Sequence, residues 1–111
     1  MKRGDLVTVA LAGDYGKPRP ALIIQADAFG EHPSVTVLLV TSEHIEAPLV
    51  RIALDPSKSN GLARRSDIMI DKAMTLPRAS IGKTIGAVDV ATMNAVAAAL
   101  MFFLGFAEAA G

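Results

Sequence analysis

The sequence predicts a mainly β domain with a single C-terminal α-helix, arranged as a small barrel. Short segments rich in β-branched and other apolar residues recur along most of the chain, and turns rich in Gly, Pro and Asp separate them. The composition changes only near the end, where Ala, Met, Leu and Phe dominate. Because 111 residues is a usual size for one domain, we predict a single domain over residues 1–111.

Each expected strand is a short apolar run that ends at a turn signal. Residues 6–11 are rich in β-branched side chains, and residues 12–18 after them form a loop with two glycines and a proline. Residues 21–25 are a continuous apolar run, typical of a strand buried on both faces. The remaining expected strands are residues 35–40, 49–54, 67–70 with a continuation over 71–76, and a glycine-broken strand at 81–88.

The C-terminal helix is expected over residues 90–104, with Asp89 as N-cap and Gly105 as the C-terminal glycine. An apolar stripe at helical spacing runs along it, formed by Met93, Val96, Ala97, Leu100 and Leu104. Further apolar residues cover much of the remaining surface, so the helix is expected to pack on two sides. One side would lie on the barrel and the other on a second subunit, which predicts a homodimer and accounts for a composition that is 51% hydrophobic.

Composition excludes several classes of function. The chain has no cysteine, and its net charge is zero, so any nucleic-acid binding depends on locally clustered cations. The longest apolar run, residues 95–107, is too short to span a bilayer, and no signal peptide is evident, so we expect a cytoplasmic protein with no membrane partner. His32 and His44 do not have a metal-ligand spacing, and no phosphate-binding glycine motif occurs, so we predict no metal and no cofactor.

The first candidate site residue is Arg19, which lies between Pro18 and Pro20 where a loop meets a strand. The two prolines limit the directions that its guanidinium can take. A planar, permanently charged fork suits a phosphate and the charge of its transition state. Lys17 is a second cation in the same loop. The alternative is a surface cation between two turn prolines.

Hydroxyls form the second candidate group, because Thr41 and Ser42 directly follow the expected strand at 35–40. Such hydroxyls either cap the next turn or donate to a phosphoryl oxygen. His44, close behind them, is either an acid–base group for metal-free phosphodiester cleavage or a solvated loop residue.

Charged residues supply the remaining candidates. The loop at residues 58–66 contains Lys58, Arg64 and Arg65, which either follow a phosphate backbone or are simply solvated. Asp71 follows a short strand, where it is either a structural ion-pair partner or part of a site.

In their order and spacing, several segments resemble the MazF/PemK (Kid) toxin family. The opening Lys-Arg-Gly-Asp at residues 2–5 is similar to the family's start, and Arg-Pro-Ala-Leu-Ile-Ile-Gln at 19–25 is similar to its second strand. Similar segments also occur at residues 40–42, at 61–62 with 66–71, and at 85–89 before the closing helix. The resemblance covers almost the whole chain.

This resemblance implies an SH3-like barrel that dimerises and binds single-stranded RNA in a groove between subunits. It also implies metal-independent, sequence-selective mRNA cleavage by the ribose 2′-hydroxyl, giving 2′,3′-cyclic phosphate and 5′-hydroxyl ends. Carried over by position, Arg19 stabilises the transition-state phosphorane or protonates the leaving oxygen, and Thr41 binds the scissile phosphate. Lys17 lies in the loop that flanks the groove in the family, and Ser42 is a binding or supporting position. Asp71 matches an acidic position that is implicated as an acid–base group in the Kid branch. The implied partner is an antitoxin with an acidic disordered tail.

Some positions depart from the family pattern. Met69 stands where the Kid branch has an Arg two residues before the acidic position, and Lys72 replaces a common Gln after it. These differences leave the general base unassigned, while Arg19 and Thr41 match the pattern.

Two other readings of the same barrel remain. One is a DNA gyrase poison of the CcdB type, whose Trp-Gly-Ile ending is absent from residues 105–111. The other is a catalytically inactive barrel that serves as a binding or dimerisation module.

Overall fold

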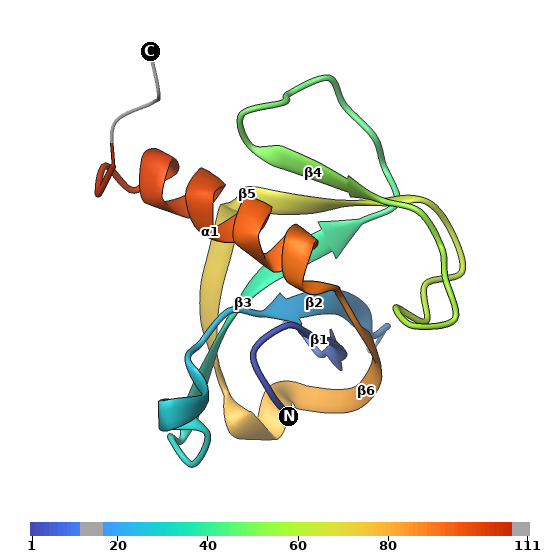
Figure 1. The fold of residues 1–111 in the computed structure, drawn as a ribbon. Coiled ribbons are helices and arrows are strands. Elements are labelled where there is room, and N and C mark those ends of the chain that lie inside the picture. The colour runs from blue at the N-terminus through green and yellow to red at the C-terminus, as the bar shows by residue number, and fades with distance from the viewer. Residues whose placement is uncertain (12–16, 108–111) are drawn as a thin grey trace.

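The computed structural model describes residues 1–11 and 17–107 (Figure 1). Most of the loop predicted at residues 12–18 therefore lies outside the described residues. The strands are β1 (Asp5–Val9), β2 (Arg19–Ile23), β3 (Ser34–Thr41), β4 (Arg51–Leu54), β5 (Ser66–Pro77) and β6 (Ile81–Ala87). Two short 3₁₀ turns, η1 (Asp27–Phe29) and η2 (Arg78–Ser80), precede β3 and β6, and α1 (Val90–Phe103) closes the chain. The predicted mainly β architecture with one C-terminal helix is confirmed.

The strands form one curled antiparallel sheet in the order β4-β5-β3-β2-β1-β6. The 12-residue β5 is central to the sheet, since its first part, residues 66–69, pairs with β4. Residues 67–68 and 73–77 of β5 pair with β3, and residues 69–72 between them have no partner on β3. The register between β3 and β5 shifts between Leu38 and Val40, which marks an irregularity where β5 bends around the barrel. The two segments predicted at 67–70 and 71–76 are thus one continuous strand.

The loop between β4 and β5 joins the two ends of the sheet by packing against β6. The backbone N–H of Ala87 donates to the Ser59 carbonyl at 2.8 Å. Gly61 makes this approach possible, because it has a φ of +67° and a β-carbon there would lie 1.9 Å from the Ile85 carbonyl oxygen. The loop that carries the predicted cations is therefore held against the barrel at its base.

Alternation along the strands divides the core into two clusters on opposite faces of the sheet. In β1, Leu6 packs under α1, whereas Val7 and Val9 point to the other face. Ala21–Ile23 of β2 are fully buried, as the unbroken apolar run predicts. Neighbouring strands thus contribute to both clusters, and the sheet has no fully solvated face along β1 and β2.

Helix α1 begins where the sequence predicts, because the Asp89 carboxylate accepts the Thr92 N–H at 2.7 Å. It ends at Phe103, one residue before the prediction, and Gly105 follows with a φ of +80°. Met93 and Val96 are buried against the sheet. Leu104, the last residue of the predicted stripe, lies just beyond the helix and is 54% exposed.

The remaining apolar surface of the helix is open. Its C-terminal part extends past the sheet (Figure 1), and large apolar side chains are exposed along it and just beyond, namely Val90, Met101, Phe102, Phe103, Leu104 and Phe106. The face against the barrel is confirmed, and the face expected to meet a second subunit is uncovered in the single chain. Within the part of the chain that the structure describes, no helix is long and apolar enough to cross a membrane.

Candidate functional site

An open groove of about 490 Å³ lies where β2 and β3 reach the β4–β5 loop. Arg19, Thr41, Ser42 and Arg64 line it, so it gathers four of the predicted site residues from three separate segments. Glu43 is the one carboxylate among its described lining residues. Cations and hydroxyl donors in one open groove suit an extended anionic ligand such as a phosphate backbone.

Arg19 and Thr41 are brought together by the pairing of β2 with β3. Ala21 pairs with Leu39 in this antiparallel ladder, and continuing the register by two residues places Arg19 beside Thr41. Residues directly opposite in an antiparallel pair project from the same face of the sheet. Both residues also line a smaller neighbouring hollow of about 120 Å³. The guanidinium and the hydroxyl therefore belong to one site.

The other predicted residues are placed differently. Lys17 is exposed two residues before β2, outside the described groove lining. Arg65 faces away, since its Nε lies 3.9 Å from Asp55 Oδ1 and it lines a different hollow. Asp71 is exposed in β5 and lines neither the groove nor the hollow beside it.

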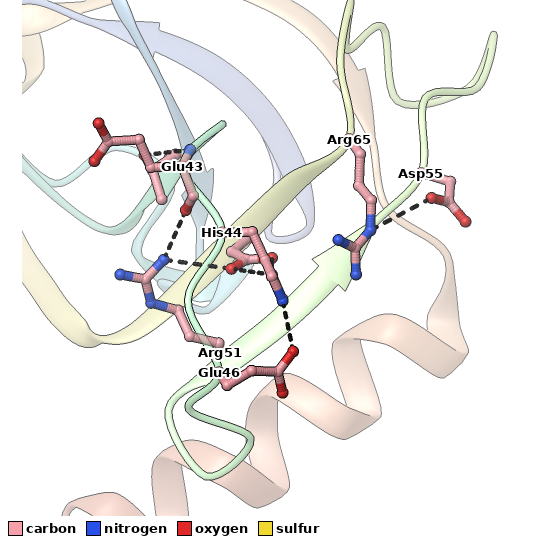
Figure 2. A network of polar contacts seen from close by, with 8 residues as sticks. Glu43, His44, Glu46, Arg51, Asp55 and Arg65 are labelled. Carbon is pink, nitrogen blue, oxygen red and sulfur yellow. Dashed lines mark hydrogen bonds and ion pairs between the residues drawn. The ribbon is translucent and has the colours of Figure 1, made fainter.

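A cluster of charged side chains borders the groove on the side of the β3–β4 connection (Figure 2). At its centre, Asp67 of β5 has a side chain that is only 2% exposed. Its carboxylate meets His44 Nδ1 at 3.0 Å and Arg51 Nη1 at 3.4 Å. The other ring nitrogen of His44 lies 3.0 Å from Glu46 Oε1. Partners on two sides compensate the buried charge of Asp67.

The carboxylates on both sides of the His44 ring favour its protonated form. Its hydrogen bond to Glu46, followed by its hydrogen bond to Asp67, raises the pKa of His44 above the usual 6.5, against a smaller opposing effect of desolvation. When both ring nitrogens donate to carboxylates, neither has a lone pair to accept a proton. Of the two roles considered for His44, general base is thus disfavoured, although the histidine is not a freely solvated residue either.

The same cluster fixes the turn that contains the predicted hydroxyls. Arg51 Nη1 donates to the Glu43 carbonyl at 3.2 Å, and the Glu43 N–H donates to Thr41 Oγ1 at 3.2 Å. Sequence reasoning assigned no role to Asp67 or Arg51. One signal in the sequence pointed to Asp67: it is a carboxylate in a predicted strand, and a buried carboxylate needs a partner of opposite charge.

Known proteins match the chain over nearly its whole length. The family of PemK-like, MazF-like toxins of type II toxin–antitoxin systems matches residues 2–104. A Mycolicibacterium smegmatis protein named as a probable endoribonuclease MazF is 45% identical over 108 residues, which cover 96% of this chain and 99% of that protein.

Solved structures share the fold. An endoribonuclease from a mycobacterial species, solved in complex with its cognate antitoxin, superposes with a TM-score of 0.81 at 26% identity, covering 98% of this chain and 99% of that one. The Mycobacterium tuberculosis toxin MazF-mt6 has a TM-score of 0.78 at 24% identity, with 91% and 96% covered, and supports the fold alone. With a family match over residues 2–104 and a relative at 45% identity, the chain belongs to the PemK-like, MazF-like toxins of type II toxin–antitoxin systems.

Proposed function

We propose that this chain is an endoribonuclease toxin that cleaves single-stranded RNA in the groove containing Arg19 and Thr41. The observation that carries the proposal is that Arg19 of β2 and Thr41 of β3 line one groove, which Ser42 and Arg64 also line. Family membership and the 45% identical relative named as a probable endoribonuclease support the same activity.

In the proposed reaction, the ribose 2′-oxygen attacks the adjacent phosphorus and the bond to the 5′-oxygen breaks. The 2′-hydroxyl loses its proton to a base, and the departing 5′-oxygen takes up a proton, which leaves a 2′,3′-cyclic phosphate and a 5′-hydroxyl end. Negative charge grows on the phosphoryl oxygens as the new bond forms. In this proposal the Arg19 guanidinium offsets that charge and the Thr41 hydroxyl donates a hydrogen bond to the same phosphate; that both residues line the groove supports these roles.

The nucleophile comes from the RNA itself, so the proposed chemistry requires neither a metal-bound hydroxide nor a protein nucleophile. The sequence contains no cysteine, and among residues 1–11 and 17–107 no group of three or more His, Asp or Glu side chains is arranged to hold a metal ion. We therefore propose cleavage that is independent of divalent cations.

The proposed physiological partner is an antitoxin with an acidic disordered segment. Arg19 and Arg64 in the groove, with Lys17 exposed nearby, are cations that such a segment would cover. The mycobacterial structure that superposes best of those described above was solved with its cognate antitoxin. Occupation of the groove by an acidic chain would exclude RNA directly.

The experiment is digestion of a long RNA by the purified protein in excess EDTA, followed by mapping and chemical analysis of the new ends. We expect cuts at a recurrent short sequence, with 2′,3′-cyclic phosphate and 5′-hydroxyl termini. Absence of cleavage with or without added divalent cations would contradict the proposed activity. Cleavage that EDTA abolishes would contradict metal independence alone.

A further inference from the structure

The carboxylate of Asp67 is the most deeply buried charged group among the described residues, yet Asp67 does not line the groove itself. Its side chain is 2% exposed, and in the ladder between β3 and β5 the residue opposite it is Thr41. On its other side Asp67 pairs with Ala53 of β4. Asp67 thus lies between β3, which ends in the groove, and β4, which follows the β3–β4 connection.

The two side chains that contact the Asp67 carboxylate lie at the two ends of the connection between β3 and β4. His44 follows the end of β3, and Arg51 is the first residue of β4. The His44 ring meets the two carboxylate oxygens at 3.0 and 3.2 Å, and Arg51 Nη1 approaches one of them at 3.4 Å. A single buried acceptor therefore ties the two ends of this connection to β5.

From Arg51, a chain of hydrogen bonds continues to the proposed site. The Nη1 that faces Asp67 also donates to the Glu43 carbonyl, and the N–H of Glu43 donates to Thr41 Oγ1. A threonine hydroxyl that accepts from the backbone on one side keeps its own proton free to donate in another direction. The groove lined by Arg19 and Thr41 is where a phosphate would receive that bond.

We propose that Asp67 is a positioning residue of the cleavage site, which acts through Arg51 and the Glu43 backbone to orient the Thr41 hydroxyl toward the scissile phosphate. The inference rests on the proposed RNA cleavage in this groove. Its physical basis is preorganisation, because a donor that is held in place before the reaction costs no reorganisation when charge develops on the phosphate. Asp67 itself does not touch the RNA.

The test is a double-mutant cycle between Asp67→Asn and Thr41→Ala, with kcat and KM measured on an RNA that carries one mapped cut site. Asp67→Asn keeps the shape of the side chain but removes its charge. We expect kcat to fall on the order of 10- to 100-fold while KM changes less than about threefold. Because Asp67 acts through Thr41, the double variant should be about as slow as Thr41→Ala alone.

Glu46→Gln is the matched control, since Glu46 also hydrogen-bonds His44 but its side chain is 90% exposed. Its kcat should stay within about twofold of the unaltered protein. Thermal unfolding of every variant is followed so that rates are compared below the lowest transition. If Asp67→Asn does not fold, Arg51→Gln replaces it in the cycle and should show the same non-additivity with Thr41→Ala.

The outcomes separate this role from the proposed function. If the unaltered protein cleaves no RNA, the proposed function fails. If it cleaves, but Asp67→Asn is equally fast or its effect multiplies with that of Thr41→Ala, only the positioning role is overturned. If Glu46→Gln is as slow as Asp67→Asn, the positioning role is also overturned, because loss of an exposed carboxylate would then have the same effect as loss of the buried one.

Discussion

The side chains on which the proposed chemistry depends are supplied by adjacent strands, so their relative position follows from backbone pairing. Arg19 opens β2, Thr41 closes β3, and the antiparallel register brings them to the same end of the sheet. Pro18 and Pro20 restrict the backbone on either side of Arg19. The site therefore consists of two positions on adjacent strands and a loop that supplies Arg64.

Replacing Arg19 should affect the chemical step more than RNA binding. Removal of one preorganised charge-stabilising group typically lowers the rate on the order of 100- to 1000-fold, or about 3–4 kcal/mol, and we expect this loss in kcat for Arg19→Ala. Arg19→Lys keeps the charge without the planar fork, so its loss should be smaller. Single-turnover cleavage at saturating protein measures both. A kcat for Arg19→Ala equal to that of the unaltered protein would remove Arg19 from the mechanism.

Arg64 and Arg65 form a natural pair of neighbours for testing the groove. Arg64 lines it, whereas Arg65 is directed toward Asp55 outside it. Arg64→Ala should therefore weaken RNA binding and reduce the slope of log affinity against log salt by about 0.7, the value for one phosphate contact on a single strand. Arg65→Ala should change neither quantity appreciably. Fluorescence anisotropy with an uncleavable RNA over a salt series measures both, and equal effects of the two variants would contradict the assigned groove.

Among the structural features between residue and whole molecule, the ion cluster at the β3–β4 connection differs most from what the sequence predicts. The strands and the capped helix are readable because β-branched runs, turn residues and Asp89 are local signals. The ion cluster is not readable, because His44 and Arg51 are 23 and 16 residues from Asp67 and meet it only through strand pairing. Arg19 and Thr41 were candidates from the residues themselves, and the family resemblance supplied their roles. Continuing the β2–β3 register explains why the two positions lie close together.

The ion cluster around Asp67 also predicts how the unfolding temperature depends on pH. Hydrogen bonds to Glu46 and Asp67 raise the pKa of His44 in the folded chain above its unfolded value near 6.5. The proton on His44 therefore stabilises the fold fully below pH 6.5, and this contribution is lost as pH rises through the folded pKa. His44→Gln should lower the unfolding temperature relative to the unaltered protein at acidic pH, and the difference should shrink at alkaline pH. Unfolding curves from roughly pH 5.5 to pH 9 measure it, and a difference that stays constant or grows with pH would contradict this account.

For the whole molecule, the uncovered face of α1 is the main feature that a single chain leaves unexplained. Contiguous exposed apolar side chains of this size mark interaction surfaces in soluble proteins. They include Phe103 and Leu104, which are 49% and 54% exposed. The sequence composition anticipated surplus apolar surface, but the position of the uncovered face could be seen only once Met93 and Val96 were found against the sheet.

We therefore predict a homodimer at micromolar concentration in which α1 contributes to the interface. Phe103→Glu would place a charge in that interface and should shift the protein toward monomer. Asn94→Glu, at an exposed polar position of the same helix, is the control and should leave the dimer intact. Sedimentation velocity distinguishes these states, and a monomeric unaltered protein would overturn the prediction.

The most direct test of the central claim uses an RNA whose mapped cut site carries a single 2′-deoxyribose on the 5′ side of the scissile phosphate. This substitution removes the proposed nucleophile and leaves the base sequence and the phosphate charge unchanged. If the 2′-hydroxyl is the attacking group, the modified site stays uncut while an all-ribose copy of the same site on the same RNA is cleaved. Cleavage of the deoxyribose site at the normal rate would show that the 2′-hydroxyl is not the attacking group and would contradict the account.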